Sequence, residues 1–592
     1  NNGIVKGSLF GGGNRNGAGS VNKTANINIE MNNGVIAGSL YGGSNIEGVI
    51  YGPVNINMTG GEISNSLYGG GKGGKDANND GTYVRNEINI NIGSNDSKYT
   101  PIIGDGVYGG SAYGLVNGTS NSDDVSNDGI LVTINKGIIN NVFGGGQGDD
   151  TYIPYVLGNI KVIINDGTIK NVFGANDKNG IPNGNIEVYI NGGEIEKTFG
   201  GGNETGAKTT NVYLNGGTSN DIFGGSNLKG DVNEANVITT GGKSTTVYGG
   251  NNEGGTTGTT NVTINGGNIN TVYGGGEQTF VTNVTNTNIN TYVPRVFGGS
   301  NKKGNIPLTN VNLLENAKTD NVFGGNNEGG EVDKSIININ GIFQNNVYGG
   351  GLKAFTKETN VNAYSGGINN LYGGGNEAGS NTTNVNLGSS IITNVYGGSN
   401  LSGDVENSYI KSIDSQNGND GITITPTTTQ STQYPQNYNA AVNINVTINN
   451  SSNANVDTWN LYLFTSDAVI GADWSSATIS EITGGFLITE KNKYWGTNPI
   501  SSNGTYSFDF HVFTNTSYDD FKINGFYFVG KDAYGNVVTS SVKINNIYGG
   551  NNEGGSTKET NINLTNKVAD YIYGGGNKAE SLNAFVDITN TN

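Results

Sequence analysis

The chain has 592 residues, of which 100 are Gly and none is Cys, and its formal net charge at pH 7 is −18. The absence of Cys excludes disulfides, thiolate metal sites and cysteine nucleophiles. The acidic balance argues against a nucleic-acid partner, because phosphate binding requires clustered basic residues and Arg15, Arg85 and Arg295 are the only arginines. No run of 18 apolar residues occurs, so we expect no membrane-spanning helix.

A tag of one aromatic residue followed by two small residues, almost always Gly-Gly, recurs along the chain. Successive tags are 27 to 40 residues apart between Phe10 and Phe173, and 24 to 26 residues apart between Phe199 and Tyr396. A fixed period in the twenties indicates stacked units that bury their apolar faces against one another. The tagged residues are Phe10, Tyr41, Tyr68, Tyr108, Phe143, Phe173, Phe199, Phe223, Tyr248, Tyr273, Phe297, Phe323, Tyr348, Tyr372, Tyr396, Tyr548 and Tyr573.

The pattern within one unit, for example residues 259–277, indicates a strand, a Gly-Gly corner and a second strand. Val262 and Ile264 alternate with polar residues, and the second short apolar run ends at Val272-Tyr273. We therefore predict an all-β chain: a parallel β-solenoid of 17 coils, irregular over residues 1–198 and regular over 199–414.

Identical side chains should form rows along this solenoid, because equivalent residues of successive coils lie above one another. The pair Thr-Asn opens the first strand of several coils, as at Thr260-Asn261, which predicts one Asn ladder beside one Phe/Tyr stack. The glycines should supply positive φ at corners and permit close approach of neighbouring backbones.

The regular spacing is interrupted once, between Tyr396 and Tyr548, which are 152 residues apart. If residues 415–542 are left out, the spacing returns to 24, so we interpret 415–542 as a domain inserted into one coil, with the solenoid resumed over 543–592. Alternating apolar stretches within the insertion predict a β-sandwich. Residues 415–437, rich in Thr, Gln, Asn and Gly, are predicted to be a linker.

Several blocks of the insertion contain aromatic residues in a characteristic order. They are residues 438–448, 458–463, 472–476 and 494–496, the last leading to 507–510, followed by Phe521-Lys522-Ile523-Asn524-Gly525. The order of these blocks resembles that of family-two carbohydrate-binding modules, which bind cellulose and chitin, and residues 521–525 resemble the closing Phe-x-Leu-Asn-Gly of that family.

The resemblance implies a β-sandwich with Trp459 in its core. It also implies a polysaccharide-binding face formed by Tyr438, Trp474 and Trp495, which would lie flat against the sugar rings of a cellulose- or chitin-like partner. Tyr438 stands where the family's cellulose binders usually have Trp, and the family's terminal disulfide is missing.

No catalytic residues are predicted. Acids that recur at equivalent corners, such as Glu253 and Glu328, are expected to be solvated, and the single His511 is expected to be structural. Asp123-Asp124 and Asp149-Asp150 interrupt the repeat and are the remaining candidates for a polysaccharide lyase or hydrolase. We expect no cofactor; Ca²⁺ held by carbonyl and Asp oxygens at corner runs such as 224–231 is the alternative.

These observations predict a non-catalytic extracellular or cell-surface protein, in which a β-solenoid shaft displays a polysaccharide-binding module for adhesion. The first alternative is a filament or surface-layer subunit. The sequence stops within a repeat-like strand at 587–592 without a cap, which predicts end-to-end self-association. The second alternative is a polysaccharide lyase or hydrolase.

Overall fold

The computed structural model describes residues 3–20, 22–74, 81–117, 126–413, 421–431, 437–465, 468–472, 477–482, 485–490, 499–535, 537–539, 543–565 and 568–589. In these residues the regular structure is β throughout, without a helix, as the sequence predicts. The chain forms a parallel β-solenoid of about 20 turns, compared with the 17 counted from the tags. Two compact units are distinguished: residues 1–311 with 325–334, and residues 312–324 with 335–592.

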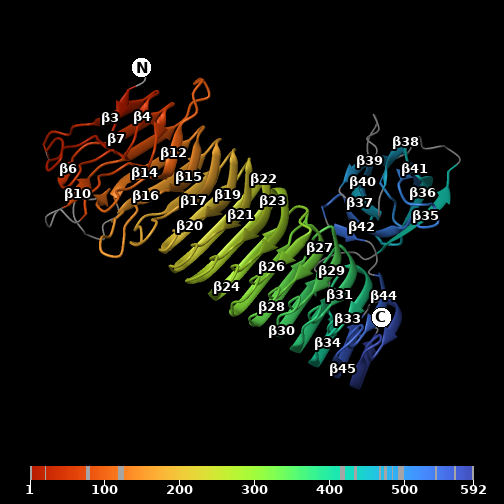
Figure 1. Cartoon of the computed structure of the whole chain (residues 1–592). Coiled ribbons are helices and arrows are strands. Elements are labelled where there is room, and N and C mark those ends of the chain that lie inside the picture. The colour runs from red at the N-terminus through yellow and green to blue at the C-terminus, as the bar shows by residue number, and fades with distance from the viewer. Residues whose placement is uncertain are drawn as a thin grey trace. The chain divides into compact units, whose positions relative to one another are not determined.

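The first unit consists of stacked coils that each contribute two main strands (Figure 1). The first strands of its coils are β3 (Ile27–Met31), β7 (Val54–Met58), β11 (Ile88–Ile92), β14 (Ser126–Ile134), β16 (Gly158–Ile164), β18 (Ile186–Ile190), β20 (Ala207–Leu214) and β24 (Phe280–Ile289). The second strands are β1 (Ile4–Val5), β4 (Val35–Ile36), β8 (Glu62–Ile63), β12 (Ile102–Tyr108), β15 (Ile138–Phe143), β17 (Thr168–Phe173), β19 (Glu194–Phe199), β21 (Thr218–Phe223) and β25 (Arg295–Phe297).

Two long strands, β22 (Val232–Tyr248) and β23 (Thr256–Tyr273), run through both positions of their coils. Short strands at the tags, β2 (Leu9–Phe10), β5 (Leu40–Tyr41) and β9 (Ser66–Tyr68), precede β12 in the early coils. The longer loops of these coils form a separate parallel sheet of β6 (Gly48–Ile50), β10 (Thr82–Val84) and β13 (Leu115–Val116). Strands β26 (Ile306–Leu313) and β28 (Val332–Ile339) each contain residues of both units.

The tagged aromatic rings stack as the repeat predicts. From Phe10 to Phe297 successive ring centroids are 4.6 to 5.1 Å apart, and the rings are close to parallel. In the second unit the stack from Phe323 to Tyr573 has spacings of 4.7 to 5.0 Å. These distances match the separation of hydrogen-bonded strands, so each ring fills the space above the ring of the preceding coil.

The sequence predicts one Asn ladder, whereas the structure contains several. At the Thr-Asn position, Nδ2 of Asn236 donates to Oδ1 of Asn211, and Asn261 donates to Asn236 in the same way, at 3.1 and 2.8 Å. A second row follows the other strand of the second unit, where Asn370 donates to Asn346 and accepts from Asn394 at 3.0 and 2.9 Å. Further rows occupy the corners, for example Asn252 to Asn227 at 2.8 Å. Because each amide has two donors and an acceptor oxygen, a row of amides satisfies itself without a partner of another type.

The Thr of the Thr-Asn pair points inward and closes its own coil. The hydroxyl of Thr260 donates to the carbonyl oxygen of Gly274, the first Gly of the tag, at 2.6 Å. This bond pairs a polar group that would otherwise be buried without a partner. Equivalent bonds join Thr210 to Gly224, Thr285 to Gly298, Ser335 to Gly349, Thr359 to Gly373, Thr383 to Gly397, Ser408 to Gly549 and Thr560 to Gly574.

The first Gly of the tag is required by close backbone approach. A Cβ placed on Gly249 would lie 2.2 Å from the carbonyl oxygen of Gly274 in the next coil. Positive φ is needed elsewhere, where the chain passes from the first to the second strand position of a coil: Gly242 within β22 and Gly267 within β23 have φ of 68° and 95°. Both roles predicted for glycine are therefore present, at different positions of the coil.

The coils of the second unit repeat the same geometry. One row of strands is β27 (Lys318–Phe323), β29 (Phe343–Tyr348), β31 (Gly367–Tyr372), β33 (Ile391–Tyr396), β44 (Lys543–Tyr548) and β46 (Val568–Tyr573). The other is β30 (Thr356–Ala363), β32 (Ser380–Leu387), β34 (Val405–Ser412), β45 (Ser556–Thr565) and β47 (Glu580–Thr589). Strand β33 pairs in parallel with β44, so that Tyr396 lies beside Tyr548 in the register of an ordinary pair of coils.

Between β34 and β44 the chain forms two antiparallel sheets, called the module below. One sheet has the order β35 (Ile422–Gln430), β36 (Ala440–Asn450), β41 (Gly504–Thr514), β38 (Val469–Ala472). The other has the order β39 (Ala477–Ile482), β40 (Gly485–Glu490), β37 (Thr458–Thr465), β42 (Ile523–Lys531), β43 (Val537–Thr539). Buried side chains of both sheets form a single apolar cluster.

The predicted linker over 415–437 is wrong for residues 422–430, which form β35. This strand pairs with β36 from Ile422 beside Asn450 to Gln430 beside Val442. Ile422 and Ile424 are buried and the Thr residues that alternate with them are exposed, a half-buried pattern that β-branched residues favour. Pro426 is tolerated because β35 lies at the edge of its sheet.

Candidate functional site

Trp459 lies in the core of the module, as the resemblance implies. Its side chain is 4% exposed and packs against Tyr506, Phe508 and Phe528, with ring centroids 5.5 to 6.2 Å away. Leu461 and Leu463, the next inward residues of β37, belong to the same apolar cluster. A residue in this position supports the fold and is unavailable to a ligand.

Tyr438, one of the three predicted binding residues, lies just before β36 and is half-buried. Its ring is nearly parallel to that of Phe513, at 12° with centroids 5.6 Å apart. Phe508, Phe510 and Val512 of β41 point into the core, so the alternation of the strand places Phe513 on the outer face of its sheet. One face of Tyr438 is thus used by Phe513, and only the other face can receive a ligand.

The other two predicted residues, Trp474 and Trp495, lie outside the described residues. The three-residue aromatic face therefore stays a prediction. Phe513 is the aromatic partner of Tyr438 that the sequence reading missed. The alternation of β41 is the sequence signal that could have found it, because Phe513 is out of phase with the buried Phe508, Phe510 and Val512 and so lies on the opposite face of the strand.

Polar side chains surround this aromatic pair on the same face of the sheet. Asn443 lies beside Thr429 on one side and beside His511 on the other. Asn445 is flanked in the same way by Thr427 and Asp509. Thr427, Thr429, Asn445 and Asp509 are exposed, so the face presents both hydrogen-bond donors and acceptors next to the aromatic rings.

His511 is buried within this face, and its environment agrees with a structural role. Its Nε2 lies 2.6 Å from the hydroxyl oxygen of Ser431, and its ring meets that of Phe513 edge to face at 5.2 Å. Burial lowers the pKa of His511 below its ordinary value, so the ring is neutral at pH 7.

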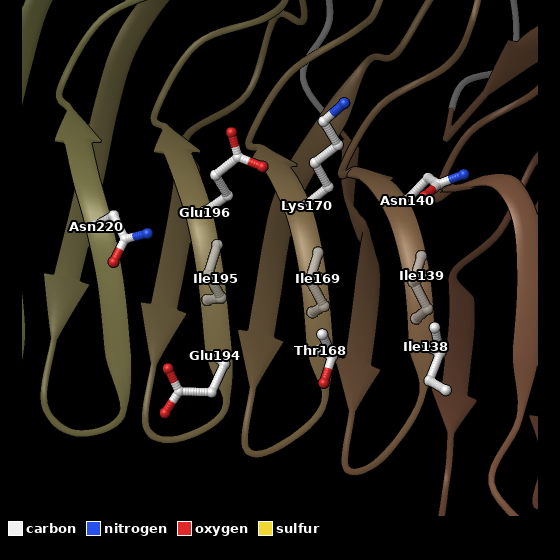
Figure 2. Close-up of a pocket in the computed structure, with 10 residues that line it drawn as sticks. All are labelled: Ile138, Ile139, Asn140, Thr168, Ile169, Lys170, Glu194, Ile195, Glu196 and Asn220. Atoms are coloured by element: carbon white, nitrogen blue, oxygen red, sulfur yellow. The ribbon is translucent and has the colours of Figure 1, made fainter.

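A second candidate lies on the solenoid, across β15, β17, β19 and β21 (Figure 2). Here a groove of about 550 Å³ is lined by Lys170, Glu194 and Glu196 together with the apolar side chain of Ile138. Glu194 and Glu196 stand two residues apart on the same outer face of β19, while Ile195 between them points inward. The sequence analysis does not single out these exposed carboxylates. The signal that could have found them is that the repeat places no acid at the equivalent positions of β15 and β17, so that both interrupt it.

Two of the acids that the sequence analysis considered, Asp149 and Asp231, have structural partners. Oδ1 of Asp149 accepts the backbone N–H groups of Thr151 and Tyr152 at 2.8 and 2.7 Å, which caps a turn. Oδ1 of Asp231 accepts both the N–H and the hydroxyl of Thr256 at 2.8 and 2.9 Å. Asp123-Asp124 lies outside the described residues.

Among the described residues no group of three or more His, Cys, Asp and Glu side chains is placed to hold a metal ion. Nor do these residues include a helix that is long and apolar enough to cross a membrane.

No known family model matches the chain, and no curated protein matches it. Among solved structures, an inactive variant of the GH20 exo-β-N-acetylglucosaminidase of Vibrio harveyi is similar at 17% identity and a TM-score of 0.17, over 22% of this chain and 18% of that enzyme. The chitin-binding domain of Chi18aC from Streptomyces coelicolor is similar at 15% identity and a TM-score of 0.13, over 17% of this chain and 91% of that domain. The chain thus spans less than a fifth of the glycosidase, and at these scores neither likeness identifies a function.

Proposed function

We propose that the chain is a non-catalytic, extracellular or cell-surface protein in which a β-solenoid carries a module that binds an insoluble polysaccharide of the cellulose or chitin type. The observation that supports this function most directly is the aromatic pair Tyr438 and Phe513 on a sheet face rich in Thr and Asn. A flat ring buries the apolar face of a pyranose at little entropic cost, and adjacent amides and hydroxyls bond its hydroxyl groups. The order of the module's sequence blocks, which resembles family-two carbohydrate-binding modules, supports the same ligand class.

The test is retention of the full chain on microcrystalline cellulose and on chitin. The variants are Tyr438→Ala and the double variant Trp474→Ala/Trp495→Ala, and the control is Tyr534→Ala, which removes the module's tyrosine with 91% exposure. We expect each test variant to weaken binding by about tenfold or more, which corresponds to about 1.4 kcal/mol, and the control to bind as the unmodified chain does. Binding of neither glycan by the unmodified chain would overturn the proposal.

The two alternative functions, a filament or surface-layer subunit and a polysaccharide lyase or hydrolase, can be tested with the same purified chain. Concentration-dependent assembly of the chain in sedimentation would favour a filament or surface-layer subunit. Release of reducing ends or unsaturated products from a glycan panel would favour a lyase or hydrolase, and loss of this activity in Glu194→Gln or Glu196→Gln would assign it to the groove of Figure 2.

A further inference from the structure

The outer face of β37 carries an aromatic side chain that is buried without belonging to the module's core. Trp459, Leu461 and Leu463 point into the core, so Tyr462 and Phe464 lie on the outer side of the five-stranded sheet. Phe464 is nevertheless 1% exposed. Its ring lies against that of Phe343, with centroids 4.4 Å apart at 29°.

Phe343 belongs to β29 of the solenoid, five residues before its tag residue Tyr348. In the same position relative to their own tag, Glu194 and Thr168 of the first unit are exposed and polar, and Ile138 is apolar and 53% exposed. Phe343, which is larger than Ile138, is only 8% exposed. The side chain at this position therefore points away from the solenoid's interior, and Phe343 owes its burial to the module that covers it.

The residues around Phe343 are adapted to close contact. In the neighbouring coil Gly367 lies beside it, and a Cβ on Gly367 would stand 3.1 Å from the Phe343 ring and 3.8 Å from the carbonyl oxygen of Phe526 in β42. In the coil on the other side, Nζ of Lys318 is 5.9 Å from the centroid of the Phe464 ring, within cation–π range. Lys318, Phe343 and Gly367 thus lie at equivalent positions of three consecutive coils. Their cation, aromatic ring and absence of a side chain all meet the same sheet of the module.

We propose that Phe343, Gly367 and Lys318 form a seat on which the module docks through Phe464, so that the module is held in one orientation on the solenoid instead of turning freely on its two connections. Docking of a tethered module is intramolecular, so that the contacts at Phe343, Gly367 and Lys318 do not have to offset the entropy cost of bringing two separate molecules together. The seat covers the outer face of the five-stranded sheet. The opposite outer face, which carries Tyr438 and Phe513, is then the one left free for a ligand, a consequence that rests on the proposed function.

The three tryptophans of the chain, Trp459, Trp474 and Trp495, all lie between β34 and β44, so the decay of Trp fluorescence anisotropy reports the rotation of the module alone. For the unmodified chain we expect only slow rotation, that of the whole protein. Phe343→Asp should introduce a fast component with a correlation time shorter by about fivefold, the ratio of 592 residues to the 119 of positions 421–539. Gly367→Leu should have the same effect, because it inserts a side chain between solenoid and module.

The matched control is Ile138→Asp, which makes an equivalent change at the uncovered position and should leave the decay unchanged. Phe464→Asp tests the module's side of the contact, and its near-ultraviolet circular dichroism shows whether the module itself remains folded. A fast component in the unmodified chain, or an unchanged decay in both Phe343→Asp and Gly367→Leu, would overturn the proposal. Because no glycan is present, this result is independent of whether the module binds polysaccharide.

Discussion

The solenoid and the module are both all-β, but they satisfy their buried groups in different ways. In the solenoid, like residues stack on like, and buried polar groups such as Thr260 and Asn251 are paired with backbone groups of the same or a neighbouring coil. In the module, unlike apolar side chains from two sheets share one core around Trp459. A change in the solenoid therefore affects mainly its two neighbouring coils, whereas a change in the module's core affects the whole module.

The largest effect that separates the two regions is expected at alkaline pH. Burial raises the pKa of Tyr273 and of Tyr396 to about 12, from about 10 in an unfolded chain. Because the folded pKa is raised, the resulting stability is fully present below pH 10 and is lost as the pH rises towards 12, by about 2 to 3 kcal/mol for each residue. Several tyrosines of the stack share this property, so the solenoid should unfold cooperatively in that interval.

Tyrosinate absorbance recorded together with far-ultraviolet circular dichroism measures this transition. Tyr273→Phe and Tyr396→Phe should shift the midpoint to higher pH, and Tyr534→Phe, on the exposed turn of the module, should not. Ionisation of the tyrosines near pH 10 without loss of β structure would contradict the expectation.

The next largest effect is in the module. Trp459→Ala should destabilise it by about 3 to 5 kcal/mol, because the cavity would adjoin Tyr506, Phe508 and Phe528. Denaturant unfolding, followed by the fluorescence of the other two tryptophans and by circular dichroism, should show an early transition of the module and an unchanged transition of the solenoid. Unfolding of both regions together would mean that they are one cooperative unit.

A smaller effect tests the bond that closes each coil. Thr260→Val keeps the shape of the side chain but leaves the carbonyl of Gly274 without its hydroxyl donor, at a cost of about 1 to 3 kcal/mol. Thr245→Val, on an exposed position of β22, should change the unfolding free energy by less than about 0.5 kcal/mol. Equal effects of the two variants in solenoid unfolding would show that the hydroxyl bond adds nothing.

The smallest effect concerns the Asn rows. Asn370→Ala removes the donor to Asn346 and the acceptor of Asn394, and should cost about 1 kcal/mol because these amides are partly open to water. Asn220→Ala, at an exposed position of β21, serves as the control. Solenoid unfolding in denaturant compares the two variants, and a loss above about 3 kcal/mol for Asn370→Ala would indicate that the row acts as a unit.

Much of the solenoid could be predicted from the sequence, because its period is a local property that each coil repeats. The positions of the tags gave the coils, and the alternation before each tag gave the strands. Less of the module could be predicted from the sequence. The sequence predicts a linker at the position of β35, because Pro426 and a run of Thr conceal the alternation of this strand, and only the pairing with β36 shows that it is a strand.

The contact of Tyr438 with Phe513 could not be predicted from the sequence either, because antiparallel pairing of β36 with β41 brings together residues far apart in the chain. The sequence alone determined which residues recur, and hence which side chains would stack, since stacking requires only that equivalent positions hold like residues. Only the tertiary structure decided the environment of Phe343. Ile138 occupies the same place in its coil and is exposed, whereas Phe343 is buried, because burial at an outward position depends on what covers it.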